Sequence, residues 1–206
     1  MGYHRAGFDI FGVDIKPQPH YPFEFYEMDA LDALAYRVPA DPAFGCDAIH
    51  ASPPCQDHML TPHKKHGTGY LLDATRQLLL EQPVPWVIEN VGRGIRGDYV
   101  ICGCQVGLKL RRKRFFETSW EGFDMRPPCH HNGPVVSVVG NGTPSWVREQ
   151  FQARYGRNPS IEDYKSAMGI DWMNRRELSQ AIPPAYTEYI GKQLLDHMNA
   201  IRSGSC

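Results

Sequence analysis

Long apolar runs are absent from this chain of 206 residues, and no segment approaches the roughly 20 consecutive apolar residues of a membrane helix. Its first residues do not have the pattern of a signal peptide, because Met1 is followed by polar and charged residues. Internal repeats and low-complexity segments are missing as well. The composition, 42% hydrophobic and 22% charged, is typical of a globular domain that can bury a core, so we expect one domain over residues 1–206.

An excess of charge of one sign is also missing. The formal net charge of −1 gives the chain no overall attraction to nucleic acid, which leaves only local basic clusters, Lys64-Lys65 and residues 111–114, for contacts with phosphates. The six cysteines are scattered through a sequence of cytosolic character, so disulfides are not the default interpretation. We therefore expect a cytoplasmic location.

The first half of the chain alternates between strand-like and helix-like segments. Strands are expected over residues 8–15, 47–51 and 84–90, and helices over residues 30–36 and 71–81. This order favours an α/β fold with a parallel sheet, where ligands bind beyond the carboxyl ends of the strands. Asp14, Cys55 and Glu89 follow or end such strands, so we expect them to converge. The second half is less regular, with a strand expected over 135–139 and helices over 145–155, 161–168 and 184–198.

Cys55 and Glu89 are the residues best suited to chemistry. Cys55 follows Pro53-Pro54, which fix the turn that directs a nucleophilic thiolate outward. Glu89 ends an apolar strand, where burial suits a carboxyl to act as an acid or hydrogen-bond donor. Each residue alone has a simpler interpretation, as a buried structural cysteine or as a carboxylate that caps the next turn. Together they predict a site that attacks an electron-poor ring and protonates it.

The motifs around these two residues resemble a known family. Ser52-Pro53-Pro54-Cys55-Gln56 and Glu89-Asn90-Val91 together resemble the catalytic signatures of cytosine-C5 DNA methyltransferases. Arg112-Lys113-Arg114-Phe115-Phe116 resembles the family's Gln-x-Arg-x-Arg-x-aromatic motif, with Leu110 in the place of the glutamine. The likeness is greatest to the compact versions carried by bacteriophages, which implies restriction-modification and, for a phage protein, the cytoplasm of the host cell.

The resemblance implies a Rossmann-like sheet that binds S-adenosylmethionine. Residues 7–15 resemble the family's second strand, whose terminal acid, here Asp14, binds the ribose of the cofactor. Met28-Asp29-Ala30 resembles the segment whose acid contacts the adenine, and residues 181–186 resemble the final motif, preceded here by Gln180 where the family usually has asparagine. The cofactor-binding residues implied in this way are Asp14, Ile15, Asp29, Ala30, Pro53, Gln180 and Ala181.

The family mechanism gives each site residue an expected role. The Cys55 thiolate adds to C6 of a cytosine flipped out of double-stranded DNA, Glu89 holds or protonates N3, and Arg114 contacts O2. Contacts with the base or the DNA are implied for Pro54, Gln56, Lys64, Lys65, Asn90, Val91 and Arg112. From the residues alone, the two lysines are explained equally well as part of a solvated surface loop.

Two departures from the family pattern limit the resemblance. Residues 1–8 resemble the end of the helix that follows the family's first strand and Gly-rich cofactor loop, so we expect the counterpart of that strand and loop to lie outside the sequence given. Because that strand is central in the family's sheet, we expect a gap between the strands ending at Asp14 and Ala51, completed by a partner or by an upstream segment. The target-recognition domain is also reduced, to residues 119–160. A catalytically inactive remnant that binds DNA or a partner, and a modified methyl donor, therefore stay open.

Two short motifs contain residue types that bind metals. Cys102-Gly103-Cys104 and Cys129-His130-His131 flank the arginine motif, but a single residue separates the first two cysteines, which fits no standard zinc finger. From the sequence we therefore assign no metal, and zinc binding by Cys102, Cys104, Cys129 and His130 stays open.

Overall fold

The structure is a computed structural model, and it describes residues 1–37, 45–54, 67, 69–92, 94–122, 126–131, 135–138 and 143–204. The chain folds into two compact units that are each assembled from separate stretches of sequence. Unit 1 comprises Met1–Asp9, Ile101–Lys113 and Asp124–Leu195, and unit 2 comprises Ile10–Val100, Arg114–Phe123 and Asp196–Cys206. The expectation of a single domain stays a prediction.

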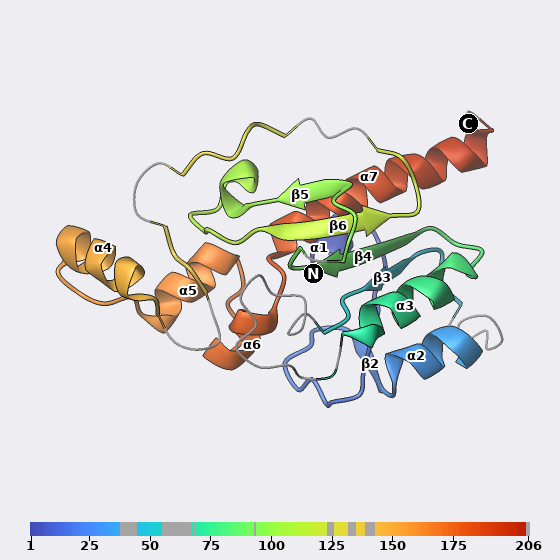
Figure 1. Ribbon diagram of the computed structural model, residues 1–206, viewed down its shortest axis with the longest axis horizontal. Helices are drawn as coiled ribbons and strands as arrows, with labels where there is room; N and C mark the ends of the chain where they lie inside the picture. The colour runs from blue at the N-terminus through green and yellow to red at the C-terminus, as the bar shows by residue number, and fades with distance from the viewer. Residues whose placement is uncertain are drawn as a thin grey trace. The chain divides into compact units, whose positions relative to one another are not determined.

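Two sheets supply the framework of unit 2 (Figure 1). Their strands are β1 (Phe11–Asp14), β2 (Glu24–Glu27), β3 (Ile49–Ala51), β4 (Trp86–Asn90), β5 (Tyr99–Ile101) and β6 (Arg114–Thr118). β1 and β2 form a parallel two-stranded sheet, and the other four strands form a second sheet in the order β3-β4-β6-β5. In the part of the chain that the structure describes, the strands ending at Asp14 and Ala51 belong to different sheets, and the expected gap between them stays a prediction.

The four-stranded sheet is mixed, which corrects the expectation of a purely parallel one. β3 and β4 pair in parallel, but β4 and β6 pair antiparallel, with Glu89 opposite Phe116. The strand β6 comes from the arginine motif, whose basic run hid the alternating pattern of Arg114 to Thr118 from the sequence analysis. The antiparallel partner is what brings this motif beside the end of β4.

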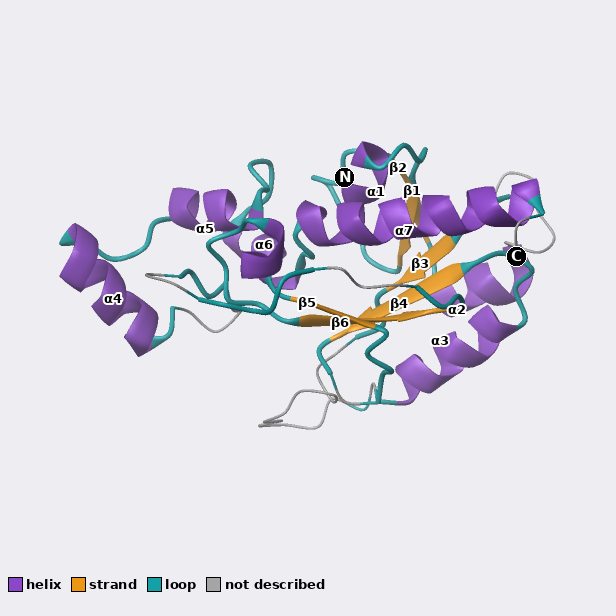
Figure 2. Ribbon diagram, turned by 90° about the horizontal axis from the view of Figure 1, so that it is seen from above, coloured by secondary structure: helices purple, strands orange, loops and turns teal. Residues whose placement is uncertain are grey.

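Helices cover one face of this sheet in unit 2 (Figure 2). They are α2 (Ala30–Asp32), the π-helical turn η1 (Ala33–Arg37) and α3 (Tyr70–Leu80). The Asp29 carboxylate caps α2 by accepting a hydrogen bond of 2.8 Å from the N–H of Leu31. Leu72 and Leu79 of α3 pack with Trp86 and Ile88 of β4 in one buried cluster. The apolar stripe of α3 therefore fixes the face of β4 that points away from Glu89.

Unit 1 is mainly helical. It contains α1 (Gly2–Arg5), the 3₁₀ turn η4 (Gly103–Val106), α4 (Ser145–Tyr155), α5 (Ile161–Met168), α6 (Arg175–Gln180) and the first part of α7 (Pro184–Ser203). Its core joins buried residues of α4 and α5 to Leu110, Val136 and Leu178. No helix in the described part of the chain is both long and apolar enough to span a membrane.

The predicted strand over residues 135–139 is not found where the structure describes this segment. Val136 forms only an isolated bridge to Leu110, and Val139 lies outside the described residues. Val135, Val136 and Val138 are nevertheless buried. The side chains of Val136 and Val138 belong to the core of unit 1, and among the described residues they have no neighbouring strand with which to form a ladder.

Candidate active site

An ion pair lies at the point where the glutamate and arginine motifs meet. Arg114 Nε is 2.8 Å from Glu89 Oε1, and the two side chains are only 13% and 8% exposed. The antiparallel register explains the contact, because Glu89 is opposite Phe116 and Arg114 is two residues before Phe116 on the same face. The structure thus brings together two of the three residues predicted to be catalytic.

Asn90 connects the end of β4 to the segment that leads to Cys55. Asn90 is 1% exposed, and its Nδ2 donates a hydrogen bond of 3.1 Å to the carbonyl oxygen of Pro53. Its Oδ1 accepts a hydrogen bond of 2.8 Å from the N–H of Val91. Cys55 itself lies outside the described residues. Pro53, two residues before Cys55, is held next to Asn90, which directly follows Glu89.

His50 of β3 is a site residue that the sequence analysis missed. Its ring faces Phe116 at 6.4 Å between ring centroids, and its Nε2 is 3.0 Å from Ser52 Oγ. Burial lowers the pKa of His50 to about 4, so the ring is neutral at physiological pH. The sequence offered one signal for His50, a histidine inside a short apolar strand. That signal is too weak to identify a site residue without knowledge that β3 pairs with β4.

A second buried ion pair lies on the opposite face of the sheet. Arg76 of α3 donates to both carboxylate oxygens of Glu117, at 3.0 Å and 2.9 Å, and Glu117 also accepts a hydrogen bond from the N–H of Arg96. Burial by itself would raise the pKa of Glu117, but the hydrogen bonds from Arg76 and Arg96 outweigh it and hold that pKa below its usual value. This pair fastens α3 to β6.

The carboxyl ends of β1 and β2 bring the predicted cofactor residue Asp14 beside the segment that leads to Asp29. The N–H of Met28 donates a hydrogen bond of 3.1 Å to the carbonyl oxygen of Asp14, which places the segment before Asp29 beside the end of β1. The Asp14 carboxylate accepts hydrogen bonds from the N–H of Lys16 and from Gln18 Nε2. Ile15, the next residue, is 63% exposed. Two carboxylates and an exposed apolar side chain therefore share one edge.

Arg112 has a structural role in unit 1. Its side chain is buried and donates hydrogen bonds to the carbonyl oxygens of Val138, Ser179 and Ala181. In return, the Tyr186 hydroxyl donates a hydrogen bond of 2.6 Å to the carbonyl oxygen of Arg112. These bonds join the arginine motif to the end of α6 and the start of α7, and the predicted contact of Arg112 with DNA stays a prediction.

The remaining predicted residues divide between the two units and the part of the chain that is not described. Pro54 and Ala30 are exposed in unit 2, whereas Gln180 and Ala181 lie at the end of α6 in unit 1. Cys55, Gln56, Lys64 and Lys65 lie outside the described residues. Their predicted roles stay predictions.

Comparison with known proteins identifies the fold. No protein family and no curated protein sequence matches this chain. The crystal structure of a DNMT2 mutant from Spodoptera frugiperda is similar with a TM-score of 0.56 and 14% identity, over 94% of this chain and 96% of that chain. S. pombe Dnmt2 methyltransferase is similar with a TM-score of 0.57 and 13% identity, over 96% of each chain. Identities this low show the fold alone, an α/β fold that resembles the fold of DNMT2 methyltransferases.

Proposed function

We propose that this chain transfers a methyl group from S-adenosylmethionine to C5 of cytosine in DNA, through a covalent adduct between Cys55 and C6. The hydrogen bond from Asn90 to Pro53 is the observation that carries the proposal. It holds Pro53, two residues before Cys55, against Asn90, the residue that follows Glu89 of the buried ion pair. The likeness to a methyltransferase fold supports the same assignment.

The chemistry requires a nucleophile and groups that stabilise the charge it creates. The Cys55 thiolate forms a bond to C6, which pushes electron density toward C5 and N3. Glu89 hydrogen-bonds the N3 edge, and Arg114 contacts O2, where negative charge develops. C5 gains the methyl group and the donor would leave as a neutral thioether. The C5 proton then passes to water, and the electron pair of that C–H bond restores the C5–C6 double bond and expels the sulfur as the Cys55 thiolate. The ion pair of 2.8 Å keeps both side chains oriented before the base arrives.

The residues at the ends of β1 and β2 fit the proposed cofactor. S-adenosylmethionine supplies an electrophilic methyl group on a sulfonium. Asp14 would accept hydrogen bonds from its ribose hydroxyls, Asp29 would face the adenine amino group, and the exposed side chain of Ile15 would pack on the adenine ring. Ala30 and Pro53 would contact the same ligand. Gln180 and Ala181 of unit 1 are proposed as cofactor-binding residues only because they belong to the segment that resembles the family's final motif.

The proposed substrate is a cytosine that has left the duplex, because a stacked base does not expose C6 to a thiolate. Pro54, Gln56 and Val91 would contact the flipped base together with Asn90. Lys64 and Lys65 would contact phosphates, which position the duplex without reading its sequence. In the phage-type setting that the motifs resemble, the reaction would take place in the host cytoplasm and protect DNA from restriction.

Transfer of a labelled methyl group from S-adenosylmethionine to unmethylated DNA tests the proposal directly. The protein used is the longest open reading frame that contains this chain, so that any upstream segment is included. We expect transfer to cytosine C5 that Cys55→Ser abolishes and that the matched control Cys46→Ser retains. DNA containing 5-fluorocytosine should become covalently attached to Cys55, because fluorine at C5 cannot leave as a proton does. Binding to DNA without transfer in any sequence context would instead support an inactive remnant.

A further inference from the structure

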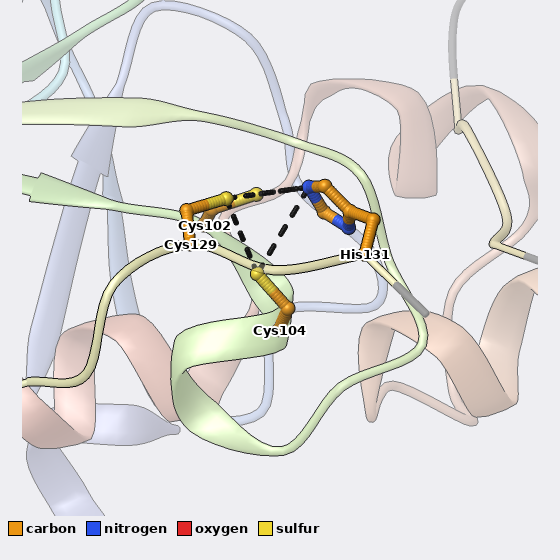
Figure 3. A group of neighbouring side chains, drawn as sticks. All are labelled: Cys102, Cys104, Cys129 and His131. Atoms are coloured by element: carbon orange, nitrogen blue, oxygen red, sulfur yellow. Dashed lines mark hydrogen bonds between the residues drawn. The ribbon is translucent and has the colours of Figure 1, made fainter. Parts of the chain in front are cut away.

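Three cysteines and one histidine of unit 1 point their ligand atoms at one another (Figure 3). The sulfur atoms of Cys102, Cys104 and Cys129 and a ring nitrogen of His131 all lie within 4.8 Å of one another. Cys104 Sγ is 3.3 Å from Cys129 Sγ, and His131 Nε2 is 3.4 Å from Cys102 Sγ and 3.3 Å from Cys129 Sγ. The remaining contact of the histidine, with Cys104 Sγ, is 3.9 Å.

These distances match the edges of a tetrahedron around zinc. With bonds of about 2.3 Å to sulfur and about 2.0 Å to nitrogen, the edges are roughly 3.8 Å between two sulfurs and roughly 3.6 Å between sulfur and nitrogen. Four of the six edges have separations of 3.3–3.9 Å, within about 0.5 Å of these lengths. The other two, from Cys102 to the other cysteines, are at most 4.8 Å. A disulfide between Cys104 and Cys129 would need a separation of about 2.05 Å and would leave Cys102 and His131 without a role.

The local sequence holds the two ligand motifs together. Cys102 lies directly before η4, where its N–H donates a hydrogen bond of 2.9 Å to Gln105 Oε1. Gln105 Nε2 in turn donates a hydrogen bond of 2.9 Å to the carbonyl oxygen of Pro127, two residues before Cys129. Gly103 separates the first two cysteines because a side chain there would meet the carbonyl oxygen of Leu110 at 2.4 Å. One glutamine thus connects the Cys-Gly-Cys turn to the segment of Cys129 and His131.

We propose that Cys102, Cys104, Cys129 and His131 bind one Zn²⁺ ion as a closed structural site. Three thiolates and one imidazole in a tetrahedron are a preferred ligand set of zinc, and four protein ligands leave no open position for catalysis. The structure selects His131, whereas the sequence analysis had named His130, and it assembles a Cys-x-Cys and a Cys-x-His motif that no standard finger spacing predicts.

The ion would join two segments that are distant in sequence. Cys102 and Cys104 belong to residues 101–113, which lead into the arginine motif, and Cys129 and His131 belong to the described stretch 126–131. Among the hydrogen bonds that the described residues form, Gln105 to Pro127 also connects these segments. Zinc would add four bonds to this connection and so order residues 105–111, which lead to Arg112. The Arg112 side chain in turn holds the end of α6.

Metal content of the full chain, purified without chelators from zinc-supplemented cells, tests the site. We expect about one equivalent of zinc, and replacement by Co²⁺ should give the visible absorption of a tetrahedral, thiolate-rich centre. His131→Ala and Cys104→Ser should lose the metal, while the neighbouring control His130→Ala and the distant control Cys46→Ser should keep it. His131→Cys should also keep zinc, which separates the loss of a ligand from a failure to fold.

Three results would overturn the proposal. The first is wild-type protein that holds less than about a tenth of an equivalent after refolding with zinc. The second is zinc content in His131→Ala equal to that of His130→Ala. The third is an intact mass two hydrogens lighter than the reduced chain after purification under reducing conditions, which would identify a disulfide between Cys104 and Cys129.

Discussion

Burial should make the contact between Glu89 and Arg114 far stronger than an equally short contact at the surface. At 2.8 Å and an effective dielectric constant of 20, two opposite charges attract by about 6 kcal/mol before the loss of hydration is subtracted. Removing one partner of a buried pair typically costs about 3–5 kcal/mol. We therefore expect Arg114→Met and Glu89→Gln each to lower the free energy of unfolding by about 3–5 kcal/mol. The double variant should lose about 2–3 kcal/mol less than the sum of the two.

Urea unfolding followed by tryptophan fluorescence measures this coupling in four proteins. The control cycle uses Lys192 and Glu188 of α7, whose charged atoms are also 2.8 Å apart but whose side chains are 59% and 28% exposed. That surface pair should couple by only about 0.3–0.5 kcal/mol. The reasoning is refuted if the buried pair is additive within about 0.5 kcal/mol, or if both cycles give the same coupling.

Three further predictions follow from single positions. Leu79→Ala should cost about 2–5 kcal/mol of unfolding free energy because Leu79 is 0% exposed. The control Leu80→Ala, at a position that is 60% exposed, should change the unfolding free energy by less than about 0.5 kcal/mol. Equal losses would contradict the packing of α3. The unfolded chain protonates His50 near pH 6.5 but the buried ring does so near pH 4, so stability is retained above pH 6.5 and should fall by up to about 3 kcal/mol as the pH drops to 4. His50→Gln should flatten that profile in chemical unfolding, and an unchanged profile would rule out this origin. Gly103→Ala should lower both the melting temperature and the zinc content, because its methyl group would meet the carbonyl oxygen of Leu110; retention of both would show that the turn is looser than described.

The helices and the first strands could be predicted where local signals agree. The predicted helix over 145–155 has the observed bounds of α4, and Gly156 explains its end because that residue is left-handed with a φ of +64°. Ser160 and Asp163 form the capping box that starts α5, again at the predicted residue. Hydrophobic periodicity and capping residues determine a helix from within one segment, so both can be recognised in the sequence.

What the sequence could not predict depends on partners from elsewhere in the chain. The strand β6 was not predicted because Arg114-Phe115-Phe116-Glu117 has one charged and one aromatic residue on each face. Such a pattern can be buried only because Arg114 pairs with Glu89 on one face and Glu117 pairs with Arg76 on the other. The direct pairing of Glu89 with Arg114 required the antiparallel register, which no local pattern encodes. The choice of His131 over His130 likewise depends on the direction of two adjacent side chains, which spacing does not determine.

The two ion pairs of the four-stranded sheet restrict how β6 can pair with β4 when the chain folds. They lie on opposite faces of β6, Arg114 with Glu89 on one side and Glu117 with Arg76 on the other. If β6 slipped by one residue against β4, every side chain of β6 would change face. Arg114 and Glu117 would then be buried opposite apolar neighbours. A slip would therefore break both pairs at once, so the strand has one register in which all its charges are neutralised. Changes in length between β5 and β6 must accordingly be absorbed within residues 102–113, which connect the two strands, and the position of Arg114 beside Glu89 is protected from them.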